Sequence, residues 1–349
     1  MGVALITGSS GLVGSEAVSF LSNSGLDVIG IDNNFRSYFF GKKASTNKNK
    51  IKLIKKFKEY KHYNYDIRNY TKLTSIFSKF KKNIRLIIHA AAQPSHDWAV
   101  KQPHVDFSIN AVGTLNMLEL TKIYCPDAVF IFVSTNKVYG DTPNKINLKE
   151  KNLRWDLEKN HKFYEGINES MTIDNSLHSL FGVSKCSGDL LVQEYGKNIG
   201  LKTGVFRAGC ITGPQQAGAE LHGFLNYLVK VNLSKSVYNI FGFKGKQVRD
   251  NIHSYDLVNC FWHFFNNPKK GEVYNIGGTR KNSCSILEAI EKVQKISNID
   301  FKYIVNKEPR VGDHKWYITD IKKFKADYKK FKFKYSLEKI LEEIIDYSS

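Results

Sequence analysis

The chain has 349 residues and a mass of 39.9 kDa, enough for about two domains of ~150 residues each. Hydrophobic residues make up 42% of it and only 7 positions are proline, which excludes disordered, collagen-like and low-complexity chains. The formal net charge is +19, but the lysines are spread over many segments and form no single patch, so we expect no nucleic-acid partner.

The apolar stretches and the cysteines point to the compartment. No stretch approaches the ~18 apolar residues of a membrane span, and the chain begins with a strand-like segment, not with a basic leader. The five cysteines are widely spaced and contain no C-x-x-C pair, so neither a metal site nor a disulfide framework is predicted. We expect a cytoplasmic protein with no membrane partner.

Short apolar runs alternate with longer segments of helical period, which is typical of βα units and of a parallel sheet covered on both faces. The sequence therefore predicts an α/β fold with a Rossmann-type doubly wound parallel sheet. The predicted strands are 3–6, 28–31, 85–89, 129–134, 203–207 and 273–276. The predicted helices are 14–23, 70–80, 110–123 and 185–198.

The pattern becomes less regular after residue 208, where glycine and proline precede short mixed elements. We expect a first domain over residues 1–208, to which residues 250–265 return. Residues 209–349 are expected to form a smaller, mixed α/β lobe.

A glycine-rich turn follows the first predicted strand directly. Gly8, Gly11 and Gly14 form a G-x-x-G-x-x-G pattern that opens a helix. Glycines allow the backbone to approach a pyrophosphate, and the amides and dipole of the helix N-terminus stabilise its charge. The sequence predicts a dinucleotide site here.

An acidic residue at the end of the second strand indicates which dinucleotide binds. Asp32 stands 18 residues after Gly14, where a carboxylate can accept hydrogen bonds from the adenosine ribose and would repel a 2′-phosphate. NAD is therefore favoured over NADP, although the nearby Arg36 keeps NADP as an alternative. Asp66 is expected to meet the adenine amino group, and residues 90–92, three alanines, leave room for the dinucleotide at the end of the next strand.

Four segments carry a resemblance to a known family. Together with the glycine turn, residues 66–68 (DIR), 134–141 (STNKVYGD) and 182–185 (GVSK) resemble the extended short-chain dehydrogenase/reductase family, in its NAD-dependent epimerase/dehydratase group. Residues 134–141, 245–250 (GKQVRD) and 275–279 (NIGGT) are most similar to the branch of CDP-paratose (CDP-tyvelose) 2-epimerases. The resemblance runs nearly end to end.

The resemblance implies an isomerase that uses NAD, with residues 1–208 as the NAD-binding domain and residues 209–349 as the nucleotide-sugar lobe. NAD⁺ would take hydride from C2 of a CDP-hexose, leaving a transient 2-keto sugar, and return it to the opposite face. The implied cofactor residues are Gly8, Gly11, Leu12, Val13, Gly14, Asp32, Asn33, Asp66, Ile67, Ala90, Ala91, Ala92, Gln93 and Lys185.

One position departs from the family pattern. The resemblance places Thr135 as the hydroxyl that holds the sugar oxygen and Lys185 as the lysine of Tyr-x-x-x-Lys, but Phe181 stands where that pattern has its tyrosine. Phenylalanine cannot exchange a proton. An engineered substitution, a natural branch with another acid/base, and a silent NAD and nucleotide-sugar binding protein are the open explanations. Tyr164 and His96 are the first-ranked replacements.

The resemblance also indicates the reaction and the substrate contacts. Asn136 and Lys137 stand where 4,6-dehydratases of the family carry an Asp-Glu pair, so a dehydratase is disfavoured, whereas a 4-epimerase or a decarboxylase stays as an alternative. Besides these two residues, Gln247, Arg249 and Arg310 are expected to bind a CDP-sugar or, as an alternative, a UDP-sugar. Residues 215–224 are expected to cover the substrate.

By analogy, a homodimer is expected through residues 110–123 and 185–198.

Overall fold

The computed structural model describes residues 2–216, 223–309 and 312–348. The chain forms two compact units. Unit 1 consists of residues 1–138, 180–207 and 258–274, and unit 2 of residues 139–179, 208–257 and 275–349. Residues 139–179, placed by the sequence pattern in the first domain, thus belong to unit 2.

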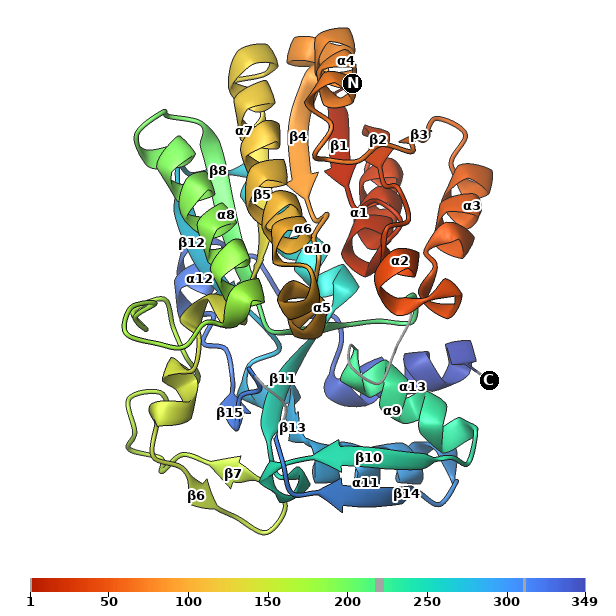
Figure 1. Cartoon of the computed structure of the whole chain (residues 1–349), viewed down its shortest axis with the longest axis vertical. Helices are drawn as coiled ribbons and strands as arrows, with labels where there is room; N and C mark the ends of the chain where they lie inside the picture. Colours follow the sequence, from red (N-terminus) through yellow and green to blue (C-terminus); the bar gives the residue numbers. More distant parts are fainter. Residues whose placement is uncertain (1, 217–222, 310–311, 349) are drawn as a thin grey trace. The chain divides into compact units, whose positions relative to one another are not determined.

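Unit 1 is built on a seven-stranded sheet (Figure 1). The strand order is β12-β8-β5-β4-β1-β2-β3, and neighbouring strands from β3 to β5 are parallel. The chain runs outward from β1 through β2 to β3 and then from β4 towards β12, which is the doubly wound arrangement that the sequence predicts. The strands are β1 (Val3–Thr7), β2 (Asp27–Ile31), β3 (Lys61–Tyr63), β4 (Ile84–His89), β5 (Val129–Thr135), β8 (Lys202–Ala208) and β12 (Glu272–Ile276).

The helices of unit 1 pack in groups against this sheet. Helix α4 packs on α7, and α7 contacts α8 through the hydrogen bond from Tyr195 to Glu119, whereas Phe20 of α1 contacts Trp262 of α10. The helices are α1 (Leu12–Asn23), α2 (Arg36–Phe40), α3 (Asn47–Lys56), α4 (Tyr70–Phe80), α5 (His96–Lys101), α6 (Pro103–Phe107), α7 (Gly113–Tyr124), α8 (Ser179–Lys197) and α10 (Ser254–Asn266).

Apolar patterning explains why these segments fold as they do. All five residues of β1 are buried, as expected of a central strand with helices on both faces. Strand β3 was not predicted, because its three residues are only partly buried and carry no apolar run. None of the helices in the described part of the chain has the length and the apolar character of a membrane span.

The predicted helix 110–123 is interrupted at its start. Residues Ser108–Val112 form a π-helical turn, η3, between α6 and α7. The Asn110 carbonyl accepts a hydrogen bond from the Thr114 hydroxyl at 2.7 Å, and a Cβ on Gly188 of α8 would lie 2.8 Å from the same oxygen. The local widening therefore occurs where α8 approaches most closely, and such turns are frequent at functional sites.

Unit 2 has its own core. Helices α9 (Phe224–Leu233), α11 (Ile286–Ser297) and α13 (Leu337–Ser348) pack on one another, and α11 begins with a capping box between Ser285 and Glu288. The remaining helix is α12 (Lys322–Asp327). The strands are β6 (Lys149–Glu150), β7 (Trp155–Asp156), β9 (Cys210–Thr212), β10 (Val237–Phe241), β11 (Val248–His253), β13 (Ser283–Ser285), β14 (Lys302–Asn306) and β15 (Trp316–Tyr317).

Strand β11 is the centre of the main sheet of this unit. It pairs in parallel with β9 and β15 and antiparallel with β13, whereas β10 pairs with β14 and β6 with β7.

Short 3₁₀ turns complete the chain: η1 (Lys42–Ala44), η2 (Lys81–Asn83), η4 (Asn136–Tyr139), η5 (Thr142–Lys145), η6 (Phe243–Gly245) and η7 (Arg280–Asn282).

A buried ion pair joins α8 to the sheet of unit 1. The Arg207 guanidinium donates two hydrogen bonds, of 2.9 and 2.8 Å, to the two oxygens of Asp189, and the Ser134 hydroxyl donates to the same carboxylate at 2.6 Å. The Asp189 side chain is fully buried. Because the pair is bidentate and a third donor supports it, the carboxylate is well compensated in the interior.

Replacing Arg207 with leucine is expected to lower the free energy of unfolding by about 3–5 kcal/mol, because Asp189 would stay buried without its counter-charge. Urea unfolding of the full chain followed by tryptophan fluorescence measures this change. The control is Lys122→Met in the half-exposed pair with Glu119, for which we expect less than about 1 kcal/mol. Equal losses in both variants would contradict the importance of the buried pair.

Candidate functional site

The glycine turn between β1 and α1 is closely packed. Gly8 has φ +67°, and a Cβ there would lie 2.8 Å from the Ala91 amide nitrogen, while a Cβ on Gly14 would lie 2.0 Å from the Gly8 carbonyl oxygen. Larger residues would therefore force apart β1, α1 and the segment after β4. Helix α1 begins at Leu12, so the amides of Leu12 and Val13 lie in its first turn, where intrahelical acceptors are lacking.

Asp32 fastens this turn to the end of β2. One oxygen of its carboxylate accepts from the Ser10 amide at 3.0 Å and the other from the Asn34 amide at 2.7 Å. The Ser10 hydroxyl is buried and has no hydrogen-bond partner within the described structure. The predicted acidic residue thus lies directly beside the glycine turn.

The ends of β2 and β3 are also tied together. The Asn33 side chain donates through Nδ2 to Asp66 at 3.1 Å, and the Arg68 guanidinium donates to both oxygens of that carboxylate at 3.0 and 2.7 Å. Burial raises the pKa of Asp66, but these Arg68 bonds outweigh it and hold that pKa below its usual value. Asp66 is therefore a carboxylate at neutral pH. Its neighbour Ile67 is buried and contacts the helix layer at Gly113.

Behind the turn lies a buried polar chain that runs from β1 to α7. The His89 ring is hydrogen-bonded with the Thr7 hydroxyl at 2.7 Å and with the Thr114 hydroxyl at 3.1 Å, and the Ala91 amide donates to Thr7. Burial, with the charge of Lys185 as a further cause, lowers the pKa of His89 to about 3. His89 is thus a neutral positioning group and not a proton donor at physiological pH.

A second buried network fixes the segment after the alanines, and sequence reasoning found only one of its members. We call Gln93, Ser95, Asp106, Asn110 and Ser184 the Gln93 network. The Asn110 side chain pairs with both backbone groups of Gln93, each at 3.0 Å, and donates to Asp106 and Ser184. The Gln93 side chain donates through Nε2 to Asp106 at 2.7 Å. The four-residue spacing of Asp106 and Asn110 was the available signal, because it places both on one helix face.

Lys185 reaches from α8 to the end of β5. Its ammonium donates to the Val133 carbonyl at 2.9 Å and lies 4.2 Å from the centroid of the Phe132 ring. Burial lowers the pKa of Lys185 to about 8, although Asp189 and Asp106 act in the opposite direction. The Thr135 hydroxyl, two residues beyond Val133, accepts from the Lys137 amide at 3.2 Å and donates to the side-chain oxygen of Asn136.

Phe181 is buried and its ring packs against His96. The two ring centroids are 4.9 Å apart, and the planes meet at 66°. His96 begins helix α5, and the preceding Ser95 caps that helix by accepting from the Trp98 amide. Two of the predicted residues, Phe181 and His96, are therefore brought together within unit 1, one helical turn from Lys185.

The predicted residues Tyr164, Gln247 and Arg249 belong to unit 2. Arg280 covers the Tyr164 ring at 3.9 Å, so the phenol is packed beneath a guanidinium. The Arg249 guanidinium donates to Asp313, and the nearby Gln247 donates to the Phe241 carbonyl while its own side-chain oxygen is buried without a partner in the described structure. Arg310 and residues 217–222 of the predicted covering segment lie outside the described residues.

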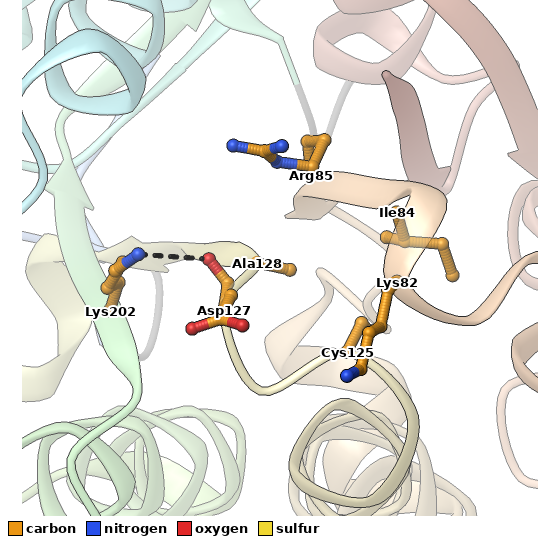
Figure 2. Close-up of a pocket in the computed structure, with 7 residues that line it drawn as sticks. All are labelled: Lys82, Ile84, Arg85, Cys125, Asp127, Ala128 and Lys202. Carbon is orange, nitrogen blue, oxygen red and sulfur yellow. Dashed lines mark hydrogen bonds between the residues drawn. The ribbon is translucent and has the colours of Figure 1, made fainter. Parts of the chain in front are cut away.

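A pocket of about 310 Å³ lies elsewhere in unit 1, and Figure 2 shows its lining. Ile84 begins β4 and Lys202 begins β8, so the pocket is at the amino ends of these strands. Ligands of open α/β sheets bind at the carboxyl ends, where the glycine turn and the alanines lie. The pocket is therefore separate from the predicted site. Its residues are Lys82, Ile84, Arg85, Cys125, Asp127, Ala128 and Lys202.

The residues present fit a dinucleotide. The turn brings backbone so close that only glycine is accommodated at positions 8 and 14, the first-turn amides of α1 lack intrahelical acceptors, and Asp32 stands beside the turn. These are the features that hold a pyrophosphate and an adenosine ribose. When bound at this position, NAD would be in contact with β1, β2 and the segment after β4.

Comparisons with known proteins identify the family. Residues 4–277 match the model of the NAD dependent epimerase/dehydratase family. A CDP-paratose 2-epimerase of Salmonella typhi is 33% identical over 327 residues, which cover 91% of each chain.

Two solved structures are similar over 99% of this chain and 98% of theirs. One is a UDP-glucose 4-epimerase of Thermotoga maritima with UDP-glucose, at 25% identity and a TM-score of 0.78. The other is a UDP-glucuronic acid 4-epimerase of Bacillus cereus, a tyrosine-to-phenylalanine mutant with NAD and a fluorinated UDP-sugar, at 26% identity and a TM-score of 0.77. The chain is a member of the NAD-dependent epimerase/dehydratase family, whose enzymes act on nucleotide sugars.

Proposed function

We propose that the enzyme epimerises C2 of a CDP-hexose. The observation that carries the proposal is the arrangement at the carboxyl end of the sheet, where the glycine turn, Asp32, Thr135 and Lys185 occur together in unit 1. The relative from Salmonella typhi, a CDP-paratose 2-epimerase at 33% identity, supports both the base and the carbon. Bound NAD⁺ supplies the chemistry by accepting hydride from a sugar carbon and giving it back.

The chain's own residues hold the reacting groups. We infer that the Thr135 hydroxyl binds the sugar oxygen and that the Lys185 ammonium stabilises negative charge near the end of β5. Asn136 and Lys137 follow Thr135 and are proposed to contact the sugar. Because water is excluded around Lys185, its charge acts over a longer range there than at the surface.

In unit 2 we propose that Gln247 and Arg249 bind the nucleotide diphosphate. Arg249 is already paired with Asp313, so a diphosphate would have to displace that carboxylate or share the guanidinium with it. The side-chain oxygen of Gln247, buried without a partner in the described structure, is an acceptor that a ligand donor can satisfy. Arg310 remains a predicted second contact.

Two other reactions remain as alternatives. A 4-epimerase or a decarboxylase would use the same cofactor turn and the same Lys185, and a UDP-sugar could replace the CDP-sugar. A silent binding protein would keep Asp32 and the glycine turn without turnover. We also infer a reducing, cytoplasmic location, which the five cysteines, all free, support.

The reaction is tested by NMR in D₂O with NAD⁺ and matched CDP- and UDP-hexoses. We expect interconversion of the C2 epimers of the CDP-sugar, with protium kept at C2 because the same hydrogen leaves and returns. Deuterium at C2 would contradict hydride transfer. Inversion at C4 would show that C4, and not C2, is the reacting carbon. Tight NAD binding with no turnover in any sugar would favour the silent binding protein.

Asp32→Asn is expected to weaken NAD binding about 10- to 100-fold, because hydrogen bonds to a charged group contribute about 1.5–3 kcal/mol. The same change should narrow the preference for NAD over NADP, since it removes the charge that repels a 2′-phosphate. Isothermal titration calorimetry with both dinucleotides measures this. Asp97→Asn, on the exposed side of α5, is the control and should leave both affinities unchanged.

We also propose a homodimer through α7 and α8. Apolar side chains that are 36–55% exposed follow one face of each helix at helical spacing. Because these two helices pack together, the same patch on a second copy would complete a four-helix layer with two-fold symmetry. The residues are Val112, Leu115 and Ile123 on η3 and α7, and Leu180, Val183 and Leu190 on α8.

Leu190→Lys is expected to convert the dimer to a monomer of 39.9 kDa, because a charge would be buried in the interface without a partner. Light scattering after size exclusion at micromolar concentration measures the mass. Ile51→Lys, at an equally exposed apolar residue of α3, is the control and should stay dimeric. A monomeric wild type would contradict the proposal.

A further inference from the structure

We propose that the imidazole of His96 exchanges the proton of the sugar hydroxyl, in place of a phenol at position 181. This inference rests on the proposed function and deepens it by naming the acid/base group. His96 would then be a catalytic residue in direct contact with the substrate oxygen.

The geometry of the aromatic pair carries the inference. A phenol at position 181 would carry its oxygen on the outer edge of the ring that Phe181 already provides. The His96 ring lies against this ring, with centroids 4.9 Å apart, and the edge-to-face angle of 66° leaves the ring edge of one residue directed at the other. A titratable ring is therefore in contact with the side chain that lacks the hydroxyl.

The Gln93 network holds His96 in this place. The Ser95 amide donates to the Gln93 side chain at 2.5 Å, and Gln93 is bonded in turn to Asp106 and Asn110. Asn110 then donates to the Ser184 hydroxyl, three residues after Phe181 on α8. The segment that carries His96 and the helix turn that carries Phe181 are thus connected by buried hydrogen bonds, which limits the movement of one relative to the other.

The proton transfer to His96 and the transfer of hydrogen to the nicotinamide balance without any further reactant. A neutral imidazole takes the hydroxyl proton as the carbon's hydrogen leaves with its electron pair to the nicotinamide, and the sugar carbon becomes a ketone. On return of that hydrogen to the opposite face, the imidazolium gives the proton back to the oxygen. Histidine suits both directions because its ordinary pKa lies near neutrality. Asp97 follows His96 on α5 and is exposed, while Asp106 on α6 and Lys185 on α8 act electrostatically on each other beside the Gln93 network.

The experiment compares His96→Gln, Phe181→Tyr and the double variant with the wild type, using NAD⁺ and the CDP-hexose. We expect His96→Gln to lower kcat about 10²- to 10³-fold while leaving the Kd for NAD within about threefold. We expect the double variant to regain at least tenfold, because the phenol restores a proton carrier. The limb of the kcat–pH profile that reports protonation of the imidazole should disappear in His96→Gln. His104→Gln, on the exposed side of α6, is the control.

A kcat for His96→Gln within threefold of the wild type would overturn the inference. The inference would also be overturned if Phe181→Tyr turned over the sugar while the wild type was inactive. If no variant turns over any sugar, the proposed function fails, and an NMR titration of the imidazole then decides. In that titration the ring signal of His96, identified by its loss in His96→Gln, should move when NAD⁺ and the CDP-sugar bind, whereas the ring signal of His104 should stay in place. An unchanged His96 signal would overturn the inference.

Discussion

The close approach of backbone at Gly8 and Gly14 is the constraint on which unit 1 depends. The Gly8 carbonyl lies where a Cβ of residue 14 would stand, and a Cβ on Gly8 would meet the backbone of Ala91. The start of α1 and the ends of β1 and β4 are therefore held within van der Waals distance. Asp32 adds the end of β2 through the Ser10 amide. One tight turn thus sets the position of three strand ends at which a dinucleotide is expected to bind.

Polar groups buried around this turn orient the segment after β4, which apolar packing alone does not do. Hydrophobic contacts hold the layers together but do not orient a loop. The Gln93 network and the Thr7–His89–Thr114 chain are directional, and they connect the segment after β4 to α7 and α8. The Asp189–Arg207 pair then anchors α8 to the sheet. Leaving any of these groups unsatisfied in the interior is costly, so each network favours a single arrangement.

Local signals in the sequence were sufficient for six strands of the sheet of unit 1, for α4 and for the cofactor turn, whereas α8 begins at Ser179, six residues before the predicted start. The apolar runs predicted β1, β2, β4, β5, β8 and β12 to within about one residue, and the glycine spacing located the turn between β1 and α1. Strand β3 was missed because three partly buried residues carry no periodic pattern. The π-helical turn at Ser108–Val112 was missed because no local pattern marks it; in the fold it lies against Gly188, a residue far along the chain.

Some residues of the site could likewise be found from the sequence, whereas others depend on tertiary contacts. Asp32 and Lys185 belong to motifs and could be found by spacing, but Asp106, Asn110 and Ser184 are scattered residues whose roles come from the fold. The contact between His96 and Phe181, 85 positions apart, is likewise a tertiary fact. Arg249 was predicted from a motif, whereas its pairing with Asp313 was not, because no local pattern links the two.

The two faces of α8 have a consequence for how this chain can change. Phe181, Ser184 and Lys185 face inward, while Leu180, Val183 and Leu190 face outward on the same turns. Each helical residue rotates the chain by ~100°, so one inserted or deleted residue near Gly188 would turn one half of the helix against the other. The inward-facing residues before the change and the outward-facing apolar residues after it would then no longer point in their present directions relative to each other. Such a helix tolerates substitution more readily than a change of length, because one inserted or deleted residue between Leu180 and Leu190 disturbs its buried and its exposed face together.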